Sequence, residues 1–320
     1  MIKRFSSHSI CYAVLLLLPF YSSNAFSESG IFGSGACEKE ITEPYVNAIV
    51  EEVFNHKLER LENEGKLPDT FWSKNKGLAF AVCDNGGSYD TRVFYGKGVV
   101  FDYQMIGFLF AQSRALIVGR YISRSRQFDV HKELVLQFVK QGSKLEAGPL
   151  AIIEEKAMEL EIGKKDEYDK MLTNSDFKRR EKTLFLQALY FLSMHERCHV
   201  ALNHIPRKDK SVTKQQLEEL EADKCAIDII NADEAQYKQS PVSFFGVLMT
   251  VATQAIVSNI PALATNGSHP STRMRLTQAR DIVLKYISNS KAPDAKNYEA
   301  TIKGIAAYFD RLLADLKINL

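Results

Sequence analysis

The stretch LYFLSMHERCHVALNH, residues 189–204, is an apolar run that contains His195, Glu196 and His199 within five positions. Its length and apolar spacing favour a helix that is buried in the core of a domain. Burying charge-capable side chains in such a helix costs free energy unless a partner satisfies them. The three residues therefore indicate a site rather than an ordinary core segment.

Helical geometry places His195 and His199 on one face, because residues four apart differ by roughly 40° around the axis. Their imidazoles can then share one metal ion, and zinc accepts neutral imidazole nitrogen. Glu196 follows the first histidine directly. In the pattern H-E-x-x-H this glutamate is the general base that takes a proton from the water activated by the metal.

A third ligand is expected in the segment EELEADKCAID, residues 218–228. Glu219 and Asp223 are four residues apart and therefore share one helical face. Nineteen residues separate His199 from Glu219, which is enough for a turn and the start of a second helix. Glu219 is then the candidate ligand. Asp223 is expected to accept a hydrogen bond from the far nitrogen of a ligand histidine, which would fix its tautomer.

Other interpretations of this acidic segment stay open. Glu218 and Glu221 are alternatives to Glu219, although neither has a carboxylate four residues later. The whole cluster could also be the solvated face of a surface helix. We expect His204, five residues after His199, to interact with the dipole at the end of its helix rather than to bind the metal.

Three ordered motifs resemble the HtpX-like and CAAX-prenyl-protease-like family of zinc metalloendopeptidases. HERCHVALNH matches the family's H-E-x-x-H with a further histidine, ELEADKCA matches E-x-x-A-D, and SHPSTRMRL matches H-P-x-T-x-x-R. The resemblance covers about residues 185–280 and extends more weakly to 77–110. It implies a gluzincin-type site in which Zn²⁺ is bound by His195, His199 and Glu219.

The same resemblance implies a mechanism of peptide-bond hydrolysis with Glu196 as the base. It also implies that His269 and Arg275 lie near the cleft, where they assist the substrate, stabilise the oxyanion or support the ligands. The family's edge strand aligns extended peptide, and GLAFAVCDNGG and GKGVVFDY are similar to its strands. The family's several membrane spans are absent here, which points to its exported, soluble branch.

The N-terminus has the layout of a secretory signal peptide over residues 1–25. Lys3 and Arg4 form a positive region, an apolar segment follows, and SNA at 23–25 is a cleavage site before Phe26. The alternative is an uncleaved signal anchor. We therefore expect an exported protein, either periplasmic or secreted.

The mature chain offers no electrostatic reason to bind nucleic acid. The whole chain has 41 basic and 39 acidic residues, and the two extra basic residues lie in the signal peptide.

Four cysteines remain after cleavage, which allows three pairings in an oxidising compartment. We favour Cys37 with Cys83. A free, buried Cys198 is equally compatible with the sequence, and Cys225 completes the set.

The remaining chain predicts an α+β fold that is mainly helical, a zincin-like metallopeptidase domain with a small sheet and two zinc-ligand helices. Residues 26–40 are expected to be a flexible segment, and 41–320 a single domain. β-rich segments and the turn signal DNGG predict three or four strands within about 77–122. The active-site helix is expected at about 176–205 and the second ligand helix at about 214–231.

The segment PVSFFGVLMTVATQAIVSNIPAL, residues 241–263, is nearly long enough to cross a membrane. However, Thr250, Thr253 and Gln254 need polar partners that lipid does not supply. We expect a buried core helix, while peripheral membrane association stays open.

These observations predict a zinc metalloendopeptidase, a hydrolase of exported or envelope proteins with a role in protein quality control. Its expected partners are polypeptide substrates and not nucleic acid, and the sequence leaves the oligomeric state open. The alternative is a zinc-stabilised periplasmic chaperone or assembly factor with little or no proteolytic activity, because the same cleft and sheet edge could hold unfolded chains without cutting them.

Overall fold

The computed structural model describes residues 39–41, 49, 54–84, 89, 91–94, 98–123, 126–141, 148–162, 165–204, 211–237, 243–258, 260, 272–289 and 295–316. The predicted signal peptide and His269 lie outside these ranges. All structural statements below concern the described residues.

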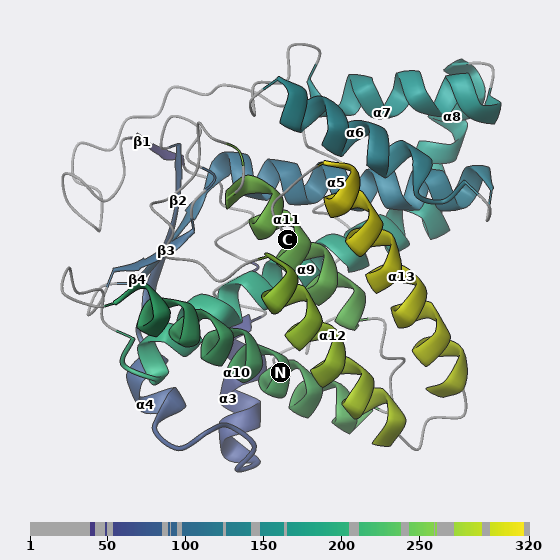
Figure 1. Cartoon of the computed structure of the whole chain (residues 1–320). Helices are drawn as coiled ribbons and strands as arrows, with labels where there is room; N and C mark the ends of the chain where they lie inside the picture. The colour runs from purple at the N-terminus through teal and green to yellow at the C-terminus, as the bar shows by residue number, and fades with distance from the viewer. Residues whose placement is uncertain are drawn as a thin grey trace, which may run out of the picture.

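Helices make up most of the fold (Figure 1). The long helix α9 packs against α5, α10 and α11, and α12 packs against α10, α11 and α13. The bounds are α3 Asn55–Asn63, α4 Phe71–Asn75, α5 Tyr103–Ile122, α6 Asp129–Lys140, α7 Pro149–Ala157, the π-helical turn η2 Met158–Ile162, α8 Lys165–Thr173, α9 Ser175–Ala201, α10 Val212–Tyr237, α11 Ser243–Ser258, α12 Thr272–Asn289 and α13 Ala295–Asp315.

The sheet is small and mixed, with strand order β1-β2-β4-β3. β2 is parallel to β4, while β1 and β3 are antiparallel to their neighbours β2 and β4. Both β3 and β4 pack against α9, so the sheet lies beside the helix of the H-E-x-x-H motif. The predicted architecture, α+β and mainly helical with a small sheet, is confirmed. The strands are β1 Lys39–Ile41, β2 Ala79–Asp84, β3 Arg92–Phe94 and β4 Gly98–Asp102.

The prediction of strands up to about residue 122 is wrong beyond Asp102, because α5 begins at Tyr103. The Asp102 carboxylate caps this helix by accepting hydrogen bonds from the backbone N–H groups of Gln104 and Met105, at 2.9 and 3.1 Å. α5 is buried along most of its length, so its apolar residues follow no helical period. Length and the Asp cap, rather than periodicity, distinguish such a segment from a strand.

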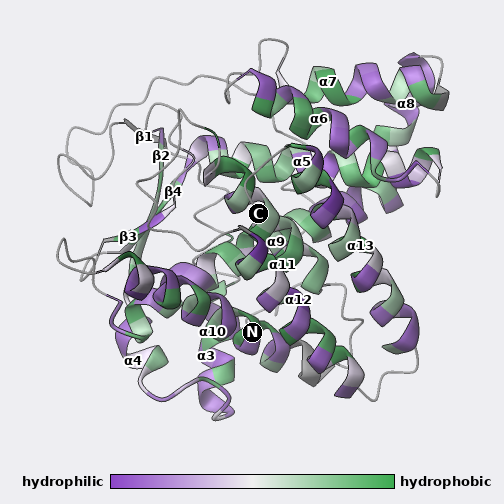
Figure 2. Cartoon of the chain, in the orientation of Figure 1, coloured by the Kyte–Doolittle hydropathy of each residue, from purple (hydrophilic) through white to green (hydrophobic). Residues whose placement is uncertain are grey.

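The core helix predicted within 241–263 is confirmed by α11, which Figure 2 shows as largely hydrophobic. A side chain at Gly246 would meet the Cβ of Gln187 at 2.5 Å, so glycine lets α11 approach α9 closely. The polar residues have internal partners: Thr250 and Thr253 donate to carbonyls one turn earlier, at 2.9 and 2.7 Å. In the described part of the chain, no helix combines the length and apolarity needed to span a bilayer.

Two disulfides involve described cysteines. Cys198 on α9 is bonded to Cys225 on α10, so the interpretation of Cys198 as a free cysteine is wrong. The sequence allows this pairing but does not select it, because the two residues come together only when α9 packs on α10. Cys83 is also disulfide-bonded, and its predicted pairing with Cys37 falls outside the described residues.

Candidate metal centre

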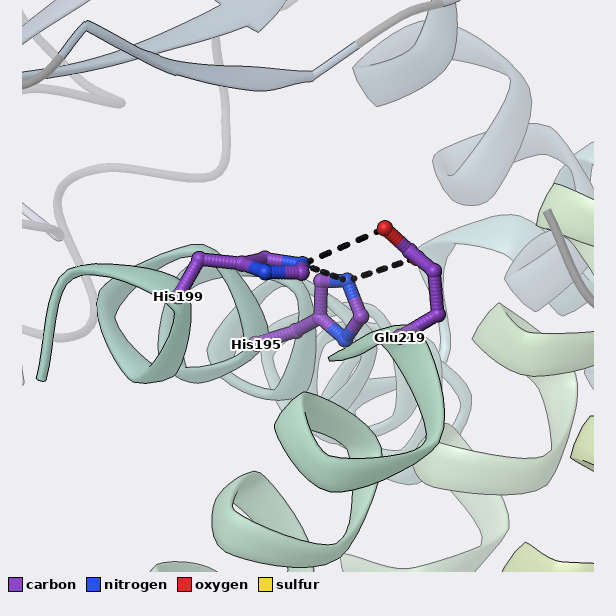
Figure 3. Close-up of side chains that lie close together, drawn as sticks. All are labelled: His195, His199 and Glu219. Carbon is purple, nitrogen blue, oxygen red and sulfur yellow. Dashed lines mark hydrogen bonds and ion pairs between the residues drawn. The ribbon is translucent and has the colours of Figure 1, made fainter. Parts of the chain in front are cut away.

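The helix that carries the H-E-x-x-H motif begins after Asn174, whose side-chain oxygen accepts hydrogen bonds from two backbone N–H groups of the first turn. Its C-terminal half is buried, which leaves His195 only 2 % exposed. His195 and His199 lie one turn apart and point to the same side of α9 (Figure 3). The predicted active-site helix at about 176–205 corresponds to this element.

The second ligand helix, predicted at about 214–231, corresponds to α10, which packs along α9. It brings Glu219 toward the two histidines (Figure 3). The Nε2 atoms of His195 and His199 are 3.1 Å apart, and each lies 3.4 Å from a carboxylate oxygen of Glu219. Candidate ligand atoms from all three residues lie within 4.8 Å of one another.

These spacings fit a zinc ion. Four ligand atoms at the corners of a tetrahedron, each about 2.0–2.1 Å from the metal, are roughly 3.3 Å apart. The observed separations of 3.1 and 3.4 Å are close to that edge length. Two imidazoles and one carboxylate are also a donor set that catalytic zinc uses, with a fourth position for water or substrate.

Asp223 lies directly behind His195. Its Oδ1 is 2.9 Å from His195 Nδ1, which makes an ion pair. The carboxylate is fully buried and accepts two hydrogen bonds from Arg275, at 2.7 and 2.6 Å. Since a proton on Nδ1 leaves Nε2 free for a metal, this contact favours the ligand tautomer of His195.

Arg275 extends from α12 and is also buried. Besides Asp223, it donates to the side-chain oxygen of Gln254 at 3.0 Å, and its Nη1 is 3.8 Å from Glu219. Its guanidinium is thus engaged behind the candidate ligands, which leaves it less suited to stabilise an oxyanion.

Glu196 is buried beside His195, and its charge contributes to the electrostatic environment of Arg275. The other predicted catalytic residue, His269, lies outside the described residues. When ionised, Glu196, Glu219 and Asp223 outweigh the one guanidinium, which gives the group a net charge of −2 with neutral histidines. A divalent cation would neutralise this charge.

The protonation of the metal-free group reflects the same excess of carboxylates. Burial lowers the pKa of His195, but Asp223 and Glu219 outweigh it and raise the value to about 10. Burial, together with the charge on His195, lowers the pKa of His199 to about 3. Without metal, His195 is therefore protonated on both ring nitrogens, and its positive charge offsets part of the excess of carboxylates.

His204 was expected to serve only the helix dipole, yet it contacts a candidate ligand. Its Nδ1 lies 3.1 Å from Nδ1 of His199, and its Nε2 lies 3.1 Å from a carboxylate oxygen of Glu221. Asn203, which favours the left-handed conformation that ends helices, is the sequence signal that could have revealed this turn.

Comparison with known proteins adds one result. Residues 146–291 match the family model Peptidase U49. The matched segment is shorter than half of the chain, but it contains α9, α10 and α12 and therefore all three candidate ligands. No curated protein and no solved structure matched the chain.

This match supports a peptidase, and hence a hydrolase that acts on polypeptides. It does not single out the HtpX-like and CAAX-prenyl-protease-like family, so the resemblance to that family rests on the three sequence motifs alone.

Proposed function

We propose that the protein is a zinc-dependent endopeptidase. The observation that carries the proposal is the group of His195, His199 and Glu219, whose atoms have the spacing of zinc ligands. The match of residues 146–291 to a peptidase family supports it independently of this geometry.

When bound, zinc supplies Lewis-acid polarisation of the scissile carbonyl and of the attacking water. Glu196 takes the proton of that water and later delivers it to the leaving amine. Asp223 keeps the proton of His195 on Nδ1, and Arg275 holds the Asp223 carboxylate in place. His269 remains a candidate for contact with the substrate on the basis of the sequence motif alone.

An extended substrate would align along β3. This strand is at one end of the order β1-β2-β4-β3, so its outer edge has no strand partner among the described residues. β3 also packs against α9, which carries the two histidines. Addition of a peptide to such an edge presents its backbone in a regular conformation.

We further propose that the protein acts after export, in the periplasm or outside the cell. The signal-peptide pattern at residues 1–25 and the disulfide-bonded state of Cys83, Cys198 and Cys225 support this location, because disulfides persist in oxidising compartments. Mass spectrometry of protein recovered from the envelope fraction should give an N-terminus at Phe26. Recovery of the uncut chain only from the cytoplasm would refute export.

The test of the function compares three proteins that begin at Phe26: wild type, Glu196→Gln and Glu219→Ala. We expect one zinc per wild-type chain by native mass spectrometry with elemental analysis, and cleavage of an unfolded fluorescent polypeptide. Glu196→Gln should keep its zinc and lose roughly 10²–10⁴-fold in rate. Glu219→Ala should lose zinc, whereas Glu218→Gln removes a charge from the same helix and should change neither property.

Folded, metal-replete wild-type protein without zinc would refute the metal site. Zinc binding with undiminished cleavage by Glu196→Gln would refute the role of the base.

A further inference from the structure

His204 occupies a fixed position in the turn that ends α9. The N–H of His204 donates to the carbonyl of His199 at 2.9 Å, and the N–H of Asn203 donates to that of Val200 at 3.2 Å. Asn203 has a φ of 58°, in the left-handed region. This pair of bonds with a left-handed residue is the Schellman motif, which brings the residue two after the C-cap back over the residue at C3.

In this turn the two residues that meet are His204 and His199. Their ring centroids are 5.2 Å apart and their Nδ1 atoms 3.1 Å apart. Schellman turns usually place an apolar pair at these positions. Two histidines instead make a polar contact that is directed at a candidate metal ligand, and the five-residue spacing between them follows from the geometry of the turn.

Only one assignment of protons satisfies every contact of these rings during metal binding. His199 Nε2 faces His195 and Glu219, so it must be unprotonated to bind a metal. The proton of His199 is then on Nδ1 and is donated to Nδ1 of His204. The proton of His204 is consequently on Nε2 and is donated to Glu221.

We propose that His204 and Glu221 are positioning residues for the metal ligand His199. His204 holds the ring and keeps its proton on Nδ1, and Glu221 fixes the tautomer of His204. The proposal rests on the zinc site proposed above. The metal-bound state thus has two supports, a direct carboxylate, Asp223, for His195 and a histidine-to-carboxylate chain for His199.

The two residues that support His199 differ in burial, which sets the expected sizes of the effects. His204 is 7 % exposed, whereas the side chain of Glu221 is 64 % exposed. Replacement of His204 by Leu should weaken zinc binding by about 10–100-fold, as for other groups that orient a ligand. Glu221→Gln should weaken it less than about tenfold, because water can replace an exposed acceptor.

The test is a competition titration of zinc with a chromophoric chelator on the chain from Phe26. His204→Gln should recover part of the affinity lost in His204→Leu, because the amide oxygen can accept the Nδ1 proton of His199. Glu218→Gln is the matched control for the loss of charge on α10 and should bind zinc like wild type. Circular dichroism shows whether each variant is folded.

A second measurement needs no variant. Nitrogen-15 NMR of the zinc-loaded wild-type protein should show His199 protonated at Nδ1 and His204 protonated at Nε2, a pattern that a merely structural role would not require. Wild-type affinity in folded His204→Leu, or a His204 proton on Nδ1, would overturn this proposal alone. A wild-type protein that binds no zinc would overturn it together with the proposed function.

Discussion

Two buried histidine clusters in this molecule have opposite chemistry. His195 is surrounded by carboxylates, and its Nε2 points to the same place as that of His199. His131 on α6 is fully buried too, but its Nδ1 lies 2.6 Å from the Tyr308 hydroxyl and its Nε2 lies 3.0 Å from the Gln112 side-chain oxygen.

The difference separates a binding site from a structural network. Both ring nitrogens of His131 have neutral partners, and the side-chain N–H of Gln112 donates a hydrogen bond to the Thr253 hydroxyl at 2.7 Å. Neither nitrogen is left for a ligand. At the metal centre, two imidazole nitrogens and a carboxylate converge with a surplus of negative charge, so burial of a histidine alone does not identify a site.

The largest effect on stability is expected at the metal centre, where the buried carboxylate of Asp223 pairs with the buried guanidinium of Arg275. Arg275→Leu leaves the buried Asp223 carboxylate without its main counter-charge, which should lower the free energy of unfolding by about 3–5 kcal/mol. Urea unfolding of the metal-free protein measures this loss. Arg280→Leu, on the same helix and paired among the described residues with the exposed Asp281, should cost less than about 1 kcal/mol. Equal costs for the two variants would contradict the assignment.

The second effect concerns the disulfide, which joins the two ligand helices across 27 residues of sequence separation. The double variant Cys198→Ala/Cys225→Ala should lose about 2–4 kcal/mol, since the unfolded chain is no longer constrained. It should also bind zinc more weakly, while the hydrogen-bonded cluster around His131 should be unaffected because that residue is not part of this link. A double variant with wild-type stability and zinc affinity would show that helix packing alone aligns the ligands.

The third effect is specific to the neutral cluster. Burial lowers the pKa of His131 from 6.5 to about 3. Between these two values the unfolded state binds a proton at His131 and the folded state does not. The contribution of the neutral His131 to stability is therefore complete above about pH 6.5 and is lost as the pH falls toward 3. At pH 4.5 the loss is about 2–3 kcal/mol.

The comparison of wild type with His131→Gln isolates that loss from the titration of carboxylates elsewhere. The difference in unfolding free energy between the two proteins should shrink as the pH falls from 7 to 4.5. A difference that is constant over this range would mean that His131 titrates alike in both states.

The smallest effect is expected from one hydroxyl group of the same cluster. Tyr308→Phe removes the donor to His131 Nδ1 and leaves a buried acceptor without a partner, which should cost about 1–2 kcal/mol. Zinc affinity should not change, since this hydroxyl contacts no ligand. Tyr298→Phe on the same helix is the control and should stay within about 0.5 kcal/mol of wild type. A loss of zinc affinity in Tyr308→Phe would show that the two clusters are coupled.

The sequence predicts those parts of the site that depend on local spacing. The four-residue intervals of His195 with His199 and of Glu219 with Asp223 place each pair on one helical face, and the structure brings the two faces together. The partner of Asp223 was harder to foresee, because Arg275 comes from a helix about fifty residues further along.

What the sequence did not predict depends on burial and tertiary packing. α5 was interpreted as strand because a helix that is buried over most of its surface has no clear amphipathic period. The bond between Cys198 and Cys225 requires two helices to pack first. The role proposed for His204 depends on a turn conformation for which Asn203 is the sequence signal. Its acceptor Glu221 was passed over because no carboxylate lies four residues after it, as Asp223 does after Glu219.

The turn after α9 limits the insertions and deletions that this part of the chain can tolerate. Surface turns ordinarily tolerate insertions and deletions. Here one residue added or removed between Val200 and His204 would rotate the second imidazole away from His199, although Leu202 and Asn203 are exposed and lie at the end of a helix. If His204 positions His199 as proposed, the five-residue interval between them is as fixed as the spacing of the ligands themselves. The residue at which α9 ends then decides whether His199 is held in the orientation that binds a metal.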